Sequence, residues 1–530
     1  MKKLLPEYDY IIIGSGFGGS VSALRLTEKG YNVLVIEAGK RFQDHDFPKS
    51  TWDIKKFLWA PIIRCFGIMR MSVFKHVFIL SGRGVGGGSL VYANTLLVPK
   101  DIVWNDPKWS NINDWKKIMP EFYSLAKSML GVTKNPYLGP ADLLLQKASR
   151  ETGYDHTFYA TDVGIYFGKP GIESEDPFFN GEGPRRSGCT LCGGCMVGCT
   201  HNAKNTLVKN YLYLAEKKGA TILAENEVVD VRPIASGYQI TYQSTTKLIS
   251  IKKTLNCKGV IFSAGVLGTV KLLLELKEKK SLPLLSSMVG NIIRTNSESI
   301  IGVRVENQDL EMDRGIAIGS GIHIDEHTHI EAVRYPKKSD ALSLICTILP
   351  IDRQNLPRIT SWIIDLIKHP IRNFRALYPI GWAKNTIILL VMQTLDGSIQ
   401  FKLRRSFLNP FKRTLKTENH SGNKISSFIP LANKFAHHLA KHTEKGTPLT
   451  SVTEIFLDVP TTAHILGGAI MGANENEGVI NFKNEVFNYK NMYVCDGSMV
   501  SANLGVNPSL TITALTEHAM SHIPKKTKDC

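Results

Sequence analysis

Four cysteines in the middle of the chain have the spacing of a metal or redox site. They are Cys189, Cys192, Cys195 and Cys199, a C-x2-C-x2-C-x3-C run. Bacterial ferredoxins hold iron–sulfur clusters with this spacing, and four thiolates also suit zinc. Thr200 stands where those ferredoxins carry proline, and no second cysteine run follows. The alternative is a reduced, glycine-rich turn that positions the segment 204–205.

The C-terminal part of the chain carries a second set of side chains that suit catalysis. His464 stands shortly before a glycine pair, and Asp496 with Gly497 ends an apolar run. Asn507 and Pro508 open a run that predicts a helix, with Asn507 at the N-cap. An imidazole titrates near neutral pH and can therefore accept a proton in a reaction. Taken alone, such a histidine is more often a core or turn residue.

The elements that must position these groups begin with a nucleotide-binding pattern at the N-terminus. Residues 8–13 and 33–36 predict buried strands, and residues 20–29 predict a helix between them. Gly14, Gly16 and Gly19 have the G-x-G-x-x-G spacing, in which the glycines allow a tight turn, approach of a pyrophosphate and close helix packing. Glu37 follows Gly19 at the distance expected for a carboxylate that binds ribose hydroxyls. This pattern predicts a dinucleotide site for NAD or FAD.

A second glycine-rich segment favours FAD over NAD. Five glycines crowd residues 82–88, where their N–H groups can surround an anion. A single cofactor that contacts two distant glycine-rich segments is expected to be FAD. Asn94 is then a candidate for a hydrogen bond to the flavin edge, and Val228 for a backbone contact near the adenine. If the helix after Asn507 starts beneath the flavin, its positive end would stabilise the anionic reduced ring.

Composition limits the classes of partner. The chain has 530 residues and 43% hydrophobic content, enough for more than one domain. Its formal net charge of +17 suits an anionic cofactor or lipid surface, and no motif for reading nucleic acid is present. The N-terminus lacks the apolar core of a secretory signal, so we expect a cytoplasmic protein. A diffusely basic soluble protein is the alternative to membrane contact.

Two segments combine apolar and basic residues. Residues 52–80 fit either a membrane-surface segment or a cap over a substrate pocket. Residues 332–417 contain no glutamate, and their four acids lie among many lysines and arginines. Together these segments give the hypothesis of peripheral contact with an anionic membrane.

With these motifs, the chain resembles the glucose–methanol–choline (GMC) flavoprotein oxidoreductases over nearly its whole length. It is most similar to their bacterial cholesterol-oxidase-like branch. The resemblance rests on five sets of residues: Gly14–Gly19 with Glu37, Gly84–Ser89 with Asn94, Ser263–Thr269, His464 with Gly467-Gly468, and Asp496–Ser498 with residues 507–511.

The resemblance implies an α/β fold, α+β overall. A Rossmann-like FAD-binding domain is expected from residues 1–50, 80–100, 200–300 and 455–530. A discontinuous substrate domain, built on a β-sheet with helices, is expected from residues 51–79, 101–199 and 301–454, with a cysteine-rich loop at 187–200. The expected cofactor-binding residues are Gly14, Ser15, Gly16, Phe17, Gly18, Gly19, Glu37, Ala38, Gly86, Gly87, Gly88, Ser89, Asn94, Val228, Ala264, Gly265, Asp496, Gly497, Asn507 and Pro508.

The resemblance also implies a reaction, the oxidation of an alcohol by hydride transfer to N5 of FAD. It gives His464 the removal of the hydroxyl proton and Asn507 the orientation of the hydroxyl and the flavin edge. The chemistry agrees, since an alcohol releases hydride readily only if its O–H proton also leaves. The expected substrate is a sterol or another bulky lipid alcohol.

Three features stay open at this stage. The resemblance implies a glutamate that isomerises the steroid double bond. The segment 332–417, where this glutamate is expected, lacks one, so Asp365 or Asp396 would have to substitute for it. Electrons are expected to pass to oxygen or, if the cysteines hold a cluster, to another acceptor. Alternative functions are a dehydrogenase of a non-sterol alcohol and a non-catalytic flavin or iron–sulfur carrier.

Overall fold

The nucleotide-binding half is built on the sheet that the first strand begins. The computed structural model describes residues 4–5, 7–306, 310–405, 413–420 and 425–527. The sheet runs β12 (Thr221–Leu223), β2 (Val33–Ile36), β1 (Glu7–Ile13), β15 (Lys253–Phe262), β14 (Gly237–Ser244) and β13 (Asn226–Ile234), with β27 (Met492–Val494) also paired to β15. β12, β2, β1, β15 and β27 are parallel, and β13 and β14 add an antiparallel extension. Ile11, Leu34 and Ile261 are fully buried, as expected for strands covered on both faces.

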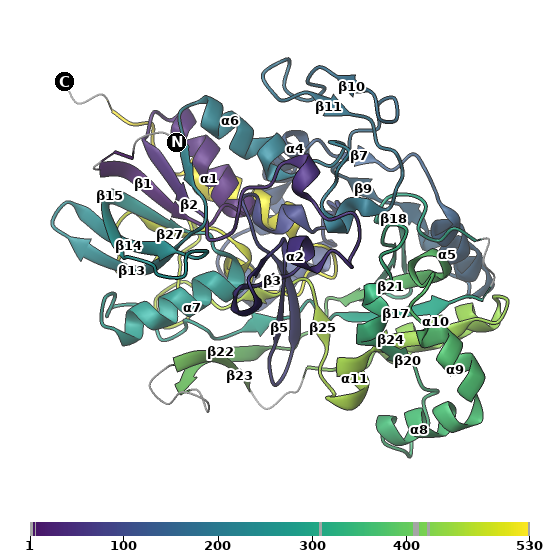
Figure 1. Ribbon diagram of the computed structural model, residues 1–530. Coiled ribbons are helices and arrows are strands. Elements are labelled where there is room, and N and C mark those ends of the chain that lie inside the picture. Colours follow the sequence, from purple (N-terminus) through teal and green to yellow (C-terminus); the bar gives the residue numbers. More distant parts are fainter. Residues whose placement is uncertain (1–3, 6, 307–309, 406–412, 421–424, 528–530) are drawn as a thin grey trace.

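The helices of the nucleotide-binding half lie around this sheet (Figure 1). They are α1 (Phe17–Glu28), α4 (Trp115–Leu130), α6 (Tyr211–Lys217), α7 (Gly265–Glu278) and α12 (Ser509–Ser521). α1 packs against both α6 and α12, and α12 packs in turn against α4. The helix that follows the glycine turn therefore lies beside the last helix of the chain.

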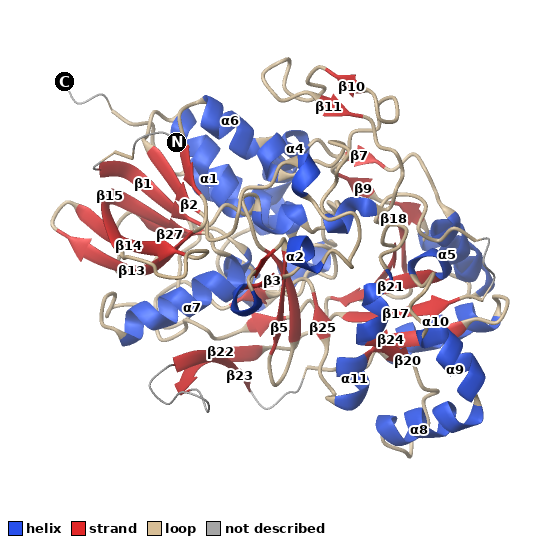
Figure 2. Ribbon diagram, in the orientation of Figure 1, coloured by secondary structure: helices blue, strands red, loops and turns tan. Residues whose placement is uncertain are grey.

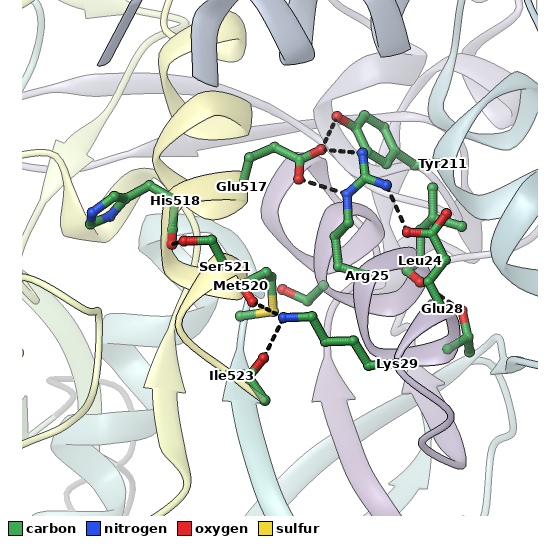
Figure 3. A network of polar contacts seen from close by, with 12 residues as sticks. Leu24, Arg25, Glu28, Lys29, Tyr211, Glu517, His518, Met520, Ser521 and Ile523 are labelled. Carbon is green, nitrogen blue, oxygen red and sulfur yellow. Dashed lines mark hydrogen bonds and ion pairs between the residues drawn. The ribbon is translucent and has the colours of Figure 1, made fainter. Parts of the chain in front are cut away.

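A buried polar network fixes α1 to α12 (Figure 3). Arg25 donates to both carboxylate oxygens of Glu517, over 2.7 and 2.9 Å, and Tyr211 donates to the same carboxylate over 2.6 Å. Lys29 donates to the carbonyl oxygens of Met520 and Ile523 at the end of α12. A forked guanidinium–carboxylate pair sets orientation as well as distance. The network therefore holds α12 in one position relative to the glycine turn.

The second large sheet is antiparallel and lies in the part of the chain predicted to bind substrate, which is called the substrate half below. Its order is β20 (Cys346–Ile348), β24 (Thr447–Ser451), β17 (Ser299–Arg304), β21 (Thr386–Gln393), β19 (Thr328–Val333), β18 (Ile318–His323) and β8 (Tyr159–Ala160). Successive side chains alternate between the two faces. Ile330 and Ala332 pack on one face with α5 (Pro140–Glu151) and α10 (Pro430–Lys441). Val333, on the other face, lines the cavity described below.

Smaller elements connect the two halves (Figure 2). One further sheet has the order β23 (Arg413–Asn419), β22 (Ile399–Arg405), β16 (Ile293–Arg294) and β26 (Leu466–Gly467). Another has the order β25 (Thr461–Thr462), β6 (Phe78–Gly82) and β5 (Met69–Val73). The two-stranded pairs are β3 (Trp59–Ala60) with β4 (Cys65–Phe66), β7 (Thr133–Lys134) with β9 (Asp162–Val163), and β10 (Glu173–Ser174) with β11 (Arg186–Ser187). The remaining α-helices of the described residues are α2 (Ile54–Phe57), α3 (Pro107–Ser110), α8 (Arg358–Lys368), α9 (Pro370–Leu377) and α11 (Val452–Phe456).

The predicted strands 8–13 and 33–36 are confirmed, with a one-residue extension of the first. Three details differ from expectation. The last helix is capped by Pro508 instead of Asn507. The segment 221–234 forms two strands, β12 and β13, because Glu225 between them has a positive φ of 59°. α4, which the predicted boundaries assign to the substrate domain, packs against α12 of the nucleotide-binding half.

Candidate functional site

The three glycines of the first turn differ in what surrounds them. Gly14 has φ +100°, and a Cβ there would lie 2.3 Å from the carbonyl oxygen of Ser263. A Cβ on Gly19 would lie 2.1 Å from the carbonyl oxygen of Gly14, so α1 packs directly on the turn. A Cβ on Gly16 would meet no atom within 4 Å. Gly16 therefore leaves its backbone open to a ligand at the N-terminus of α1, where unpaired N–H groups favour phosphate.

The second glycine-rich segment touches the first. A Cβ on Gly87 would lie 2.7 Å from Cα of Gly16. The hydroxyl of Ser15 donates to Glu37 over 2.7 Å and accepts from the N–H of Gly86 over 3.1 Å. Two segments that are far apart in the sequence therefore form one wall.

One cavity of about 490 Å³ joins this wall to the substrate sheet. Its lining includes most of the predicted cofactor residues: Gly14, Gly16, Phe17, Gly18, Glu37, Ala38, Gly87, Gly88, Val228, Ala264, Gly265, Asp496, Gly497, Asn507 and Pro508. At the other end the lining is largely apolar, with Ile300, Ile318, Val333, Leu342, Ile388 and Leu390. The volume lies within the range of ordinary ligand pockets.

Five predicted cofactor residues lie outside the lining: Ser15, Gly19, Gly86, Ser89 and Asn94. Ser15 and Ser89 instead support the loops, since Ser89 donates to the carbonyl oxygen of Gly86 over 2.7 Å. Asn94 is fully buried between the lining residues Ala93 and Thr95, and neither of its amide atoms has a partner among the described residues. Such orphaned atoms are costly, and the described residues supply no partner for Asn94. The open space at Gly16 fits a bound dinucleotide such as FAD.

His464 lies on the loop between β25 and β26 and lines the cavity. Its Nδ1 lies 3.0 Å from Oε2 of the fully buried Glu298. Glu298 is held by Thr462, whose hydroxyl donates to it over 2.8 Å, and by the N–H of Ala463. Burial lowers the pKa of His464, but the Glu298 carboxylate outweighs it and raises this pKa above its ordinary value of 6.5.

The side chain of Asn507 joins the cavity to a second buried carboxylate. Its Nδ2 donates to Oε2 of Glu331 over 3.2 Å, and its Oδ1 has no partner among the described residues. Glu331 lies on β19 and is fully buried. Burial raises the pKa of the Glu331 carboxyl to about 8, although Asn507 and His464 lower it. Glu331 is therefore able to gain and lose a proton near neutral pH.

Sequence reasoning missed Glu331 and Glu298. The glutamate that the resemblance implies was sought within residues 332–417, and Glu331 precedes that segment by one residue. Asp365 and Asp396 are not its substitutes, because Asp365 binds Arg353 over 2.6 Å and Asp396 binds Arg294. Glu331 itself lies outside the lining, but it is joined to the lining residue Asn507. A single carboxylate within the otherwise apolar run 330–333 was the available signal for Glu331. For Glu298, whose partner lies far along the chain, the sequence offered none.

The cysteine loop packs near residues 90–93, which follow the second glycine-rich segment. Cys189, Cys192, Cys195 and Cys199 line a small cavity of about 20 Å³. Among the described residues, no three of these sulfurs come within 4.8 Å of one another. The buried Lys204 donates to the carbonyl oxygens of Cys195, over 2.7 Å, and Leu90, over 3.0 Å, and burial lowers the pKa of Lys204 to about 7. The contacts of Lys204 thus join this loop to the segment that follows the second glycine run.

Comparisons with known proteins identify the family. A family model described as GMC oxidoreductase matches residues 400–516, and one for an NAD(P)-binding Rossmann-like domain matches residues 12–42. The cholesterol oxidase of Acinetobacter baumannii is 49% identical to the chain and aligns with 98% of it and 95% of its own length. The chain belongs to the GMC oxidoreductases. This GMC oxidoreductase is also 42% identical to the cholesterol oxidase of Mycobacterium tuberculosis strain H37Rv, over 98% of this chain and 92% of that one.

Solved structures show that this GMC oxidoreductase shares its fold with more distant proteins. Pyridoxine 4-oxidase from Mesorbium loti aligns with 97% of this chain and 98% of its own, with a TM-score of 0.59 and 13% identity. A fungal aryl-alcohol oxidase aligns with 98% and 99%, with a TM-score of 0.59 and 14% identity. The predicted α/β fold and Rossmann-like domain are therefore confirmed.

Proposed function

We propose that the protein is a sterol oxidase that uses FAD to oxidise the CH–OH group of its substrate. Bound FAD supplies the acceptor for the hydride, and oxygen receives the electrons, so that alcohol and oxygen yield ketone and hydrogen peroxide. The observation that carries the proposal is one cavity with a glycine-lined end for a dinucleotide, His464 in its wall and an apolar end for a bulky substrate. The names of the two closely similar relatives reported above support the sterol assignment.

His464 and Asn507 are the residues that we propose to act on the hydroxyl group. Because Nδ1 of His464 faces Glu298, its Nε2 is left to take the hydroxyl proton. Oδ1 of Asn507 has no hydrogen-bond partner in the part of the chain that the structure describes and can hold the hydroxyl in position. The apolar walls exclude water from the reacting carbon. Turnover tests the proposal: sterols should yield ketone and peroxide much faster than short-chain or sugar alcohols do, whereas equal or faster turnover of small alcohols would contradict it.

The carboxylate beside His464 should set the pH dependence of the oxidation. His464 must be neutral to accept a proton, so kcat/KM should rise as pH increases through its raised pKa. Glu298→Gln removes the negative charge that stabilises the imidazolium, and the rise should therefore move to lower pH. Glu454→Gln is the matched control, because Glu454 is equally buried but binds Ser299 and Thr450 instead. An unchanged profile in Glu298→Gln would show that another group controls the rate.

Isomerisation of the steroid double bond is a second candidate activity. Glu331 is the observation that favours it, because it is a buried carboxyl group joined to Asn507 with a pKa of about 8. After oxidation, a base at this place can take a proton from the carbon between the new ketone and the double bond. It can then return the proton to the far end of the double bond, so that no proton is gained or lost overall.

The membrane contact is proposed for α8 and α9, which lie together at the lower edge of the substrate half (Figure 1). Ile359, Ile363 and Ile367 stand on one exposed face of α8, and Ile371 and Phe374 continue it on α9. Lys368 and Arg372 flank this face, and the surrounding segment 332–417 has no glutamate. An apolar face with basic flanks suits the surface of an anionic bilayer. Among the described residues, none of the helices has the length and apolarity needed to cross one.

Vesicle cosedimentation tests this contact. Ile367→Asp with Phe374→Asp should weaken binding to phosphatidylserine-containing vesicles by about tenfold or more, since each buried side chain contributes roughly 1.5–3 kcal/mol. Leu248→Asp, which changes an equally exposed apolar residue on a distant loop, is the control. Equal binding of both variants would exclude α8 and α9 as the contact.

Metal at the cysteine loop stays a prediction. We propose iron and zinc analysis of anaerobically purified protein as its test. A content near one iron–sulfur cluster or one zinc per chain supports a metal there, and Cys195→Ser should then remove it. A protein without either metal would leave the loop as the support of Lys204 alone.

A further inference from the structure

A group of two histidines and a glutamate lies on the outer side of the substrate half, away from the cavity. His438 lies in the last turn of α10, His442 is the C-cap residue of the same helix, and Glu151 is the last residue of α5. Oε2 of Glu151 lies 3.4 Å from Nε2 of His438 and 3.5 Å from Nδ1 of His442. The two imidazole rings stack with their centroids 4.2 Å apart. Nε2 of His438 is buried and makes no hydrogen bond among the described residues.

These distances match those between ligands of a single metal ion. Nitrogen and oxygen ligands about 2.0–2.2 Å from a tetrahedral zinc ion lie roughly 3.3–3.5 Å from one another. The three ligand atoms here all lie within 4.8 Å of each other, and in the described ranges no other set of three His, Cys, Asp or Glu side chains does so. Imidazole and carboxylate ligands suit zinc and neighbouring transition metals more than calcium or magnesium.

We propose that Glu151, His438 and His442 bind a divalent transition-metal ion of the zinc class, with water as the fourth ligand. The ion would join the C-terminal ends of α5 and α10. Both helices pack on the face of the substrate sheet that is opposite the cavity, through residues such as Ala148 and Ala436. The N-terminal end of α5 is already fixed, because Asp142 pairs with the buried Arg334 over 2.6 Å. The ion would therefore stabilise the substrate half without taking part in the chemistry.

The location separates this site from the proposed oxidation. None of its three residues lines the cavity. Its failure would therefore leave the proposed function unaffected, and failure of the function would leave the metal site testable. The other metal candidate in the chain, the cysteine loop, differs in ligand chemistry and is distinguished by the spectrum of bound cobalt. Thiolate ligands give an intense charge-transfer band that imidazole and carboxylate do not.

The experiment uses tag-free, full-length protein that retains its flavin and has been dialysed against a chelator. Titration with zinc chloride by calorimetry should show one site per chain that Glu151→Gln and His442→Ala each weaken by at least about 100-fold, because losing even an outer partner of a metal ligand costs 10–100-fold. Cobalt bound at this site should lack the thiolate band. Zinc should also raise the melting temperature of the wild type and not of these variants.

His45→Ala is the matched control, because it removes an exposed histidine that lies outside the group. It should bind zinc as the wild type does. Flavin content and near-ultraviolet circular dichroism verify that each variant is folded. Absence of zinc binding in the wild type would overturn the proposal. So would binding that survives unchanged in both Glu151→Gln and His442→Ala, or cobalt that shows only the thiolate band.

Discussion

Replacing His464 with alanine should slow the reduction of bound flavin by sterol by about 10²–10⁴-fold, the usual contribution of a positioned general base. The reason is local: no other imidazole among the described residues lines the cavity. Without it the hydroxyl proton loses its proposed acceptor as hydride leaves, and the buried Glu298 loses the imidazole that lies 3.0 Å from it. Flavin binding should be retained, because the side chain of His464 pairs with Glu298 and the dinucleotide site is formed by the glycine segments.

Stopped-flow mixing under anaerobic conditions measures this rate without interference from oxygen. His156→Ala removes an exposed histidine and should reduce its flavin at the native rate. His464→Gln keeps a hydrogen-bonding side chain but cannot act as a base at neutral pH, and it should be nearly as slow as the alanine variant. Reduction of His464→Ala at the native rate would remove His464 from the mechanism.

Replacing Glu331 with glutamine should separate oxidation from isomerisation. The amide keeps the shape of the carboxyl group and can still accept a hydrogen bond from Asn507, but it cannot carry a proton between two carbons. Isomerisation should fall by about 10²–10⁴-fold, the range expected when a general base is lost. Oxidation should change much less, because the proton acceptor for that step is His464.

The unconjugated ketone should therefore accumulate in the Glu331→Gln reaction, where chromatography and the ultraviolet absorption of the conjugated product distinguish the two. Supplying this ketone directly tests isomerisation alone. Glu454→Gln again serves as the matched change of a buried carboxyl group with a raised pKa. Equal amounts of conjugated product from Glu331→Gln and wild type would exclude Glu331 as the base.

The local patterns of the nucleotide-binding half were predictable from sequence because each depends on neighbouring residues. Gly14, Gly16 and Gly19 serve a turn that one strand and one helix define. The strands 8–13 and 33–36 are apolar runs covered on both faces, which is a strong signal. The contact of Gly87 with Gly16 could be inferred only indirectly, from the requirement that one cofactor meet both segments.

Pairings between distant segments were not predictable in the same way. Glu298 reaches His464 across more than a hundred intervening residues, and nothing near either residue indicates the other. Glu331 was missed because its place in the substrate sheet, and not its sequence neighbours, brings it to Asn507. The packing of α4 against α12 was not predictable for a similar reason, because the apolar face of α4 does not indicate which element covers it.

The central claim is that the glycine turn and His464 face one cavity in which FAD and a sterol meet. Anaerobic titration of the purified protein with a 3β-hydroxysterol, followed by the visible spectrum of its flavin, tests this claim most directly. The structure predicts a yellow protein whose flavin bleaches in proportion to added sterol, with one ketone formed for each flavin reduced. A protein that purifies without flavin, or whose flavin stays oxidised in excess sterol, would contradict it.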